Sequence, residues 1–164
     1  MTTLIAYALL AVQDRPVHQN KPVAQTAQPL TMAEFAEVSQ TVDKTLAKVL
    51  KIAAPAPLKS AQGVATRSAI VSRFHVWFLA AKPKFRFTPK LATIDEQSWT
   101  LKDEKLTELA RWGFVGRLAP LATSKAAGMT PAEFGDTLGF FLSRVADLTH
   151  TPTSKYSPYM QPPP

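Results

Sequence analysis

The sequence lacks cysteine altogether and contains only three histidines among its 164 residues. Without cysteine the chain cannot form disulfides, thiolate catalytic sites or Cys-based zinc sites. The histidines, His18, His75 and His150, are far apart in sequence, and none has a histidine partner three or four positions away. A histidine-based metal site is therefore not expected, and we predict neither a metal nor a cofactor.

The sequence also lacks the short motifs that mark common catalytic and cofactor-binding sites. It has no Gly-x-Ser-x-Gly elbow, no phosphate-binding loop and no dinucleotide fingerprint. Ser72 and His75 are three residues apart on one expected helix, a spacing that often arises by chance. Carboxylates occur as sequence neighbours, such as Asp95 and Glu96, which point in different directions on a helix. We expect no enzymatic activity.

No apolar run is long enough to cross a bilayer. The run from Leu4 to Val12 spans nine residues, whereas a membrane-spanning helix needs about 20. A run of this length suits the apolar part of a signal peptide, although no positive side chain precedes it. We therefore expect a signal peptide at 1–13 and export to the cell envelope or cell surface. A short buried helix or strand is the alternative.

The charge of the chain is unbalanced towards the basic side. Nineteen Lys and Arg against twelve Asp and Glu give a formal net charge of +7. This excess favours an acidic partner, such as an anionic polysaccharide, a nucleic acid or an anionic membrane surface. The basic residues are dispersed, with no run of five or six, so a basic nucleic-acid-binding tail is not expected.

Apolar residues spaced three and four apart predict an all-α fold, a compact bundle of about four main helices. The helices are expected at about 32–51, 67–81, 103–112 and 131–148. The whole helical domain is expected to span 31–148. A linker at 14–30 precedes it, and a Pro-rich disordered tail at 149–164 follows it, because both are poor in periodic apolar residues.

Three of the expected helices open in a similar way. The openings are Thr31-Met-Ala-Glu-Phe, Thr66-Arg-Ser-Ala-Ile and Thr130-Pro-Ala-Glu-Phe. Each places a Thr at the cap position, and the first and third add a Glu three residues later, which predicts a capping box. Convergence on good helix caps is one explanation of the similarity, and an internal repeat is the other.

The surroundings of the third opening favour a repeat. Trp99 precedes a short helix, which is followed by Gly113-Phe-Val-Gly, a loop and the Thr130 opening. This order resembles an S-layer homology (SLH) module, best over 95–148, whereas over 29–81 only the helix starts are recognisable. The resemblance implies pseudo-repeated helix–loop–helix units arranged as a threefold prism. It also implies an exported protein that is held to acidic cell-wall polysaccharide.

The resemblance also suggests ligand-binding residues. In the SLH family the Arg of a Thr-Arg-Ala-Glu motif contacts the anionic sugar, and at the matching positions only Arg67 is an Arg. Met32 and Pro131 occupy the other two positions, and the second opening has Ala where the family has Glu. Arg67, its neighbour Thr66 and Trp99 are therefore the candidate ligand residues. Alternatively, Arg67 faces solvent without a role and Trp99 fills the core.

A second candidate site lies after the second expected helix, where basic and aromatic residues alternate. Lys82, Lys84, Phe85, Arg86 and Phe87 could bind single-stranded nucleic acid by charge and stacking. The simpler interpretation is a short extended connector with both Phe side chains in the core. We therefore prefer acidic cell-wall polysaccharide as the partner, with nucleic acid as the alternative and self-association as a further candidate.

Overall fold

A computed structural model describes residues 28–59 and 61–156 of the chain. The predicted signal peptide at 1–13 and most of the predicted linker at 14–30 lie outside the described residues. The described part is helical, as predicted. The helices are α1 (Met32–Leu50), α2 (Arg67–Ala81), α3 (Glu104–Arg111), α4 (Pro120–Thr123) and α5 (Pro131–Thr149), with 3-10 helices η2 (Lys82–Lys84) and η3 (Thr153–Tyr156).

The four helices expected from the sequence pattern are confirmed as α1, α2, α3 and α5, with ends that differ by a residue or two. The segment between α3 and α5, which was expected to be a loop, contains the single turn of α4. One-turn helices such as α4 bury too few side chains to leave a periodic apolar pattern in the sequence.

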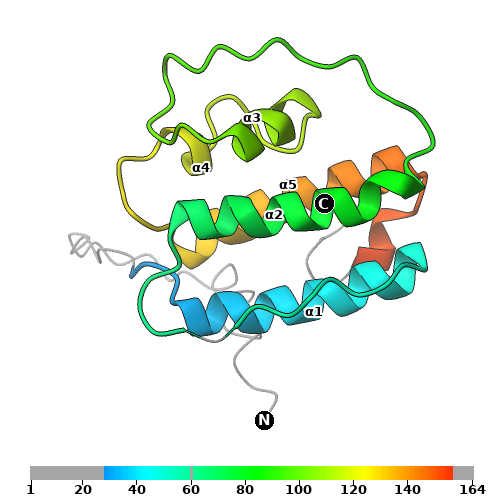
Figure 1. The fold of residues 1–164 in the computed structure, drawn as a ribbon, viewed down its shortest axis with the longest axis horizontal. Helices are drawn as coiled ribbons and strands as arrows, with labels where there is room; N and C mark the ends of the chain where they lie inside the picture. The colour runs from blue at the N-terminus through cyan, green and yellow to red at the C-terminus, as the bar shows by residue number, and fades with distance from the viewer. Residues whose placement is uncertain (1–27, 60, 157–164) are drawn as a thin grey trace, which may run out of the picture.

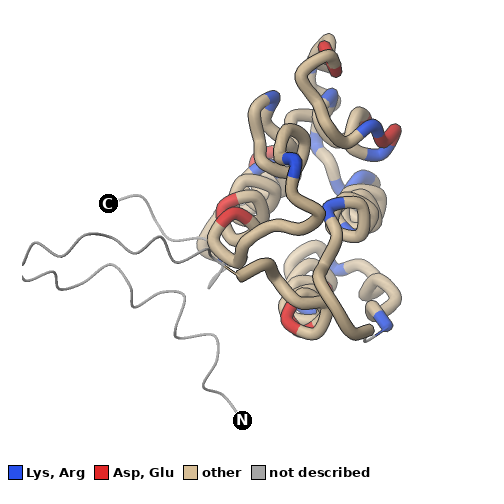
Figure 2. The backbone as a smooth tube through the Cα atoms, turned by 90° about the vertical axis from the view of Figure 1, so that its left-hand side faces the viewer, with Lys and Arg blue, Asp and Glu red and all other residues tan. Residues whose placement is uncertain are grey.

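The three long helices α1, α2 and α5 run in the same direction, from left to right in Figure 1. Seen from their N-terminal end, they form a triangle, with α3 and α4 packed above it (Figure 2). Because consecutive long helices are parallel, each connection must travel back along the bundle. The segment 51–66 returns along α1, and the longer segment 82–130 returns through α3 and α4 (Figure 1).

Aromatic side chains fill the space between the long helices. Phe74 of α2 has its ring centroid 4.9 Å from that of Phe141 and 6.1 Å from that of Phe134, both on α5. Phe114, which follows α3, lies 4.9 Å from Phe141 and extends the cluster towards the upper layer. Burial of each such side chain stabilises the fold by about 1.5–3 kcal/mol, so this cluster contributes strongly to stability.

A buried polar network fixes α1 against α2. Arg73 forms an ion pair with Asp43, and its Nη1 donates a hydrogen bond to the carbonyl of Ala56 at 2.7 Å. Trp77 Nε1 donates to the second carboxylate oxygen of Asp43 at 2.7 Å. Because an unpaired charge at such a depth is very costly, these bonds favour this register of α1 against α2.

The prediction of a disordered tail from residue 149 onwards is wrong for 149–156. Thr149 is the last residue of α5, and the chain then folds into η3, where Tyr156 is fully buried. The hydroxyl groups of Tyr156 and Thr151 are hydrogen bonded at 2.9 Å. A single Tyr between Pro, Ser and Thr residues leaves no periodic signal, so the sequence pattern missed this segment. Residues 157–164 lie outside the described part.

Candidate functional site

The three Thr-containing openings, which are far apart in sequence, meet at the N-terminal end of the bundle. The amide of Ala65 donates a hydrogen bond to the carbonyl of Leu30, and the amide of Leu30 donates to the carbonyl of Met129, both at 2.8 Å. Each of these residues directly precedes a Thr cap, so the bonds join matching positions. We refer to 28–32, 63–67 and 127–131 as the junction.

A second pair of hydrogen bonds in the junction also joins matching positions. The amide of Met32 donates to the carbonyl of Gly63 at 2.8 Å, and the amide of Arg67 donates to the carbonyl of Ala127 at 3.0 Å. Each donor follows a Thr cap, and each acceptor lies three residues before the next cap. In the third opening the donor position is Pro131, which has no N–H group, so the pattern cannot close there.

The repeated Phe of the openings has a packing role. Phe35 and Phe134, each four residues after its cap, meet edge to face with ring centroids 5.5 Å apart. The matching residue of α2, Ile70, is fully buried. Only Gly fits at 128, because a Cβ there would lie 2.5 Å from a methyl group of Val64. Both the backbone segments and the side chains of the junction are thus closely packed.

Both predicted capping boxes are confirmed. The amide of Glu34 donates to Thr31 Oγ1 at 3.2 Å, and the amide of Thr31 donates to Glu34 Oε2 at 2.9 Å. Thr130 and Glu133 make the same two bonds at 3.2 and 2.8 Å. The hydrogen bonds from the backbone and then the side chain of Thr31 lower the pKa of Glu34 below its ordinary value. Carboxylates therefore already occupy the helix starts of α1 and α5.

Arg67, the candidate ligand residue, is buried in the structure with 8% of its surface exposed. Its Nε donates to the carbonyl of Ala126 at 2.8 Å, and its Nη1 donates to Thr100 Oγ1 at 3.0 Å. Burial lowers the pKa of the Arg67 guanidinium from its ordinary value. The interpretation that Arg67 faces solvent without a role is therefore wrong, because the side chain ties the start of α2 to the segment 100–126.

The other two candidate ligand residues lie close to Arg67 in the fold. Thr66 is exposed, and its hydroxyl accepts a hydrogen bond from the amide of Ala69 at 3.2 Å. Trp99 is only 3% exposed, and its Nε1 donates to the carbonyl of Arg117 at 3.1 Å. The structure brings the three residues into one region, but Arg67 and Trp99 use their polar groups for internal bonds and Trp99 fills the core.

The basic-aromatic segment after α2 starts with a cation that is already paired. Lys82 Nζ lies 3.3 Å from Glu108 Oε1 and 5.0 Å from the ring centroids of both Phe78 and Trp112. The second oxygen of Glu108 lies 2.8 Å from His75 Nε2. The hydrogen bond with His75, supported by Lys82, lowers the pKa of Glu108. Lys82 thus helps to attach α3 to α2.

The two phenylalanines of this segment have different surroundings. Phe85 is half-buried, and its ring stacks on that of Phe114 with centroids 6.0 Å apart. Phe87 is 42% exposed, and its ring lies 5.6 Å from that of His150. Lys84, which precedes Phe85, and Arg86, which lies between the two Phe residues, are both exposed. The segment starts as the 3-10 helix η2 and offers only one of its two Phe rings to solvent.

An open groove of about 900 Å³ lies beside the junction. It is lined by Gln28, Pro29, Thr31, Ala33, Ala61, Gln62, Gly63 and Val64. Its polar groups are uncharged, and the Thr31 hydroxyl is already engaged in the capping box. The groove can therefore offer hydrogen bonds to a ligand but no cation of its own to an acidic one.

The sequence pattern missed the buried ion pair between Asp43 and Arg73, although it contained a signal. Asp43 lies four residues after Ser39 and eight after Phe35, on the face of α1 that packs inward. Arg73 interrupts the apolar stripe of α2 between Ile70 and Trp77. Two opposite charges on the inner faces of neighbouring helices predict a pair, once the helices are known to touch.

Comparison of the chain with protein-family models, with curated proteins and with solved structures finds no match. Within 28–59 and 61–156, no helix combines the length and apolarity that a membrane span needs. The same residues contain no group of three or more His, Asp or Glu side chains that could hold a metal ion.

Proposed function

We propose that this protein is an exported, non-catalytic module, similar to SLH modules, that binds acidic cell-wall polysaccharide and attaches a protein to the cell surface. The observation that carries the proposal is the junction, where three similar openings are joined by hydrogen bonds between matching positions. The resemblance to SLH modules rests in part on these same openings. Their meeting at one end of three parallel helices is the arrangement that a threefold prism of repeated units requires.

The charge of the chain supports an acidic ligand. The formal net charge is +7, and many of the Lys and Arg side chains of the described residues are exposed. A polymer with regularly spaced carboxylates would be attracted to such a surface from a distance, and salt would weaken the attraction.

Binding to purified cell-wall sacculi tests the proposal. The full chain is expected to sediment with sacculi at low salt and to be released as the salt concentration rises, because exposed charges are screened. Sacculi from which the acidic polysaccharide has been stripped serve as the control and should not retain the protein. Absence of binding to intact sacculi at low salt would contradict the proposal.

The expectation of export has its own test. The N-terminus of the protein recovered from the envelope fraction of its own cells can be sequenced. The proposal predicts a mature protein that starts close to residue 14. An intact N-terminus together with recovery from the interior of the cell would count against export.

Binding of single-stranded nucleic acid is the alternative function, and the surroundings of Phe85 weaken it. A stacking surface for successive bases needs several exposed rings, and Phe85 packs on Phe114 instead. The alternative predicts binding to a single-stranded oligonucleotide that falls steeply with salt. Tight binding of this kind, without binding to sacculi, would favour the alternative.

A further inference from the structure

The two ends of the three-helix bundle differ in charge. The segments 44–59, 74–94 and 148–156 contain the C-terminal parts of α1, α2 and α5 and the residues that follow them. Together they hold nine Lys and Arg residues and no Asp or Glu. Four of the six acidic residues of α1 and α5, namely Glu34, Glu37, Glu133 and Asp136, lie in the first two turns of these helices, whereas Asp43 lies in the middle of α1 and Asp147 in the last turn of α5.

Several of these cations are exposed at the end of the bundle where the three helices finish, on the right in Figure 1. We define this basic end by Lys48, Lys51, Lys84, Arg86, His150 and Lys155. The segments that carry these residues are joined, since the amide of Arg86 donates to the carbonyl of Leu148 at 2.7 Å and η3 packs against both α1 and α5. The basic end is therefore one continuous part of the surface.

The Lys and Arg side chains of the basic end have no acidic partner among the described residues. Two carboxylates near these segments, Asp147 and Glu108, are paired with other residues. Asp147 pairs with Arg144 at 2.5 Å, and Glu108 pairs with His75 and Lys82. The charge of the basic end is thus available to a ligand.

Backbone strain gives an independent indication about two residues of the basic end. Lys51 and His150, which end α1 and α5, both adopt the left-handed conformation, with φ of 52° and 53°. Gly is the usual residue there, because a Cβ is unfavourable in this conformation. A cation is favourable at the end of a helix dipole, but a neighbouring position could supply it without the strain. Strain of this kind points to a functional need for the side chain.

We propose that the basic end is the surface that contacts the acidic polysaccharide, through Lys51, Lys84, Arg86 and Lys155, with the exposed Phe87 ring beside them. This assignment rests on the proposed function and places the contact at the opposite end of the bundle from Arg67. The guanidinium of Arg67 is buried among internal acceptors, and the groove at the junction has no cation in its lining. Phe87 is the one exposed Phe within 82–87, which favours a polysaccharide over a stacked nucleic acid strand.

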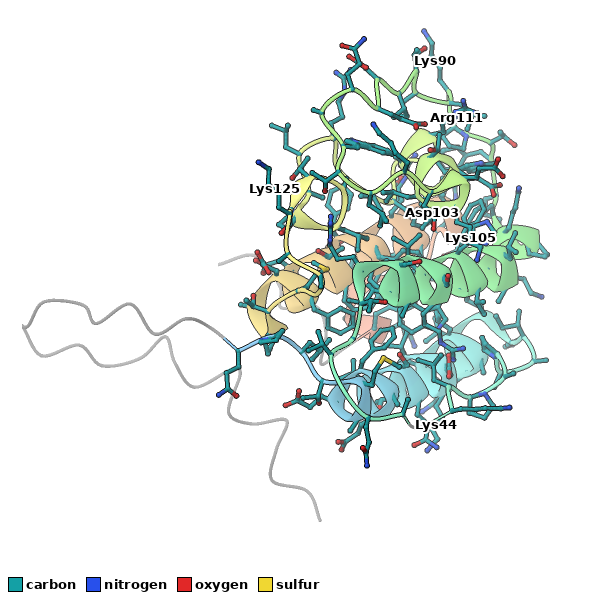
Figure 3. The ribbon with its side chains drawn as sticks, turned by 60° about the vertical axis from the view of Figure 1, so that its left-hand side comes forward. Lys44, Lys90, Asp103, Lys105, Arg111 and Lys125 are labelled. Atoms are coloured by element: carbon teal, nitrogen blue, oxygen red, sulfur yellow. The ribbon has the colours of Figure 1, made fainter. Side chains whose placement is uncertain are left out.

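The first test removes three cations of the basic end in one variant, Lys84→Gln, Arg86→Gln and Lys155→Gln. The control variant carries Lys102→Gln, Arg117→Gln and Lys125→Gln, which remove the same charge from exposed positions elsewhere. Figure 3 shows one of them, Lys125, pointing away from the helices. Affinity for sacculi at low salt should fall on the order of a hundredfold in the first variant, about fivefold for each cation at an anionic surface. The control should bind much more tightly than the first variant.

The second test separates binding from stability. Lys51→Gly removes the strain of the left-handed residue and also removes a cation. The protein should therefore melt at a higher temperature and yet bind sacculi about fivefold more weakly. A loss of binding that accompanies a gain in stability cannot result from misfolding.

The outcomes distinguish this proposal from the proposed function. If the unaltered protein does not bind sacculi, the proposed function fails, and with it this assignment. If the unaltered protein binds and the basic-end variant binds as well as the control, polysaccharide binding stands and the assignment to the basic end is overturned. The assignment would also be overturned if the basic-end variant lost binding to an oligonucleotide but kept its binding to sacculi.

Discussion

The two ends of the parallel bundle carry opposite charges and differ in how far those charges are paired within the fold. At the junction, Glu34 and Glu133 are held in capping boxes, and Arg67 is buried among internal acceptors. At the other end, Lys84 and Arg86 are exposed, with no carboxylate partner in the described part of the chain.

Helix dipoles explain why acidic and basic residues gather at opposite ends of the bundle. They do not explain why the charged side chains are paired within the fold only at the junction. Parallel helices add their dipoles, so negative groups stabilise the common start and positive groups stabilise the common end. α1 meets this requirement at both of its ends with Glu34 and Lys48, and α5 meets it at its start with Glu133, whereas α2 begins with Arg67. The difference is that the junction also has to hold three chain segments together, and it uses its polar groups to do so. The segments of the basic end are joined by a backbone hydrogen bond and by the packing of η3 against α1 and α5, so its Lys and Arg side chains stay open to a partner.

The largest expected effect comes from the buried ion pair between Asp43 of α1 and Arg73 of α2. Asp43→Ala should destabilise the fold by about 3–5 kcal/mol, because it leaves the Arg73 charge buried and unpaired. Chemical denaturation with both fluorescence and circular dichroism measures the change. Glu37→Ala, at an exposed position of the same helix, is the control and should have little effect. A minor loss in Asp43→Ala would show that the two helices do not depend on this pair.

The packing of the junction can be tested with one added methyl group. Gly128→Ala should cost about 1–3 kcal/mol, because the new Cβ would lie 2.5 Å from a methyl group of Val64 and 2.9 Å from the carbonyl oxygen of Ala65. The matched control is Gly135→Ala within α5, where a Cβ meets nothing within 4 Å. That change should stabilise the fold by about 0.5–1 kcal/mol, since Gly is unfavourable inside a helix. Equal effects of the two substitutions would contradict the close approach at the junction.

A smaller effect is expected from the caps. Thr130→Ala should destabilise the fold by about 1 kcal/mol, because the amide of Glu133 loses its acceptor. Thr31→Ala should behave alike, since the two capping boxes have the same bonds. Binding to sacculi should remain unchanged in both variants while they are folded. If either variant were as stable as the unaltered protein but bound sacculi more weakly, the ligand site would have to lie near the junction.

The smallest expected effect is a pH dependence that involves both ends. The pKa values of Glu34 and Glu108 are lowered from an ordinary value of 4.5 by hydrogen bonds in the folded protein. A lowered pKa gives stability that is present above 4.5 and is lost as the pH falls below it. Melting temperatures measured from pH 6 to pH 3 should therefore decline, and less so in the double variant Glu34→Gln, Glu108→Gln. Identical profiles would show that these carboxylates do not contribute.

The sequence predicted the helices well because their signals are local. Thr31 and Thr130 with their Glu partners mark helix starts, and apolar spacing marks the inward faces. The meeting of the three openings could not be derived in the same way, since it depends on hydrogen bonds between segments far apart in the sequence, such as the bond between Leu30 and Met129. The sequence order resembling SLH modules suggested such a meeting without giving its geometry.

The candidate site was harder to predict, because burial decides what a side chain can do. Arg67 and Lys84 are both basic residues near helix ends, and nothing in their immediate sequence shows that one is buried and the other exposed. Arg67 is covered by the segment 100–126, which comes from a distant part of the chain. The separation of charge between the two ends likewise becomes visible only once the helices are known to be parallel.

If the junction holds the fold while the basic end binds the ligand, the variant Arg67→Gln should separate stability from binding. The melting temperature and the affinity for sacculi should be measured on the same preparation. We predict a clear loss of stability, about 1.5–3 kcal/mol for the bonds of a buried charged group, with unchanged affinity of the folded protein. Unchanged stability together with a marked loss of affinity would contradict the claim.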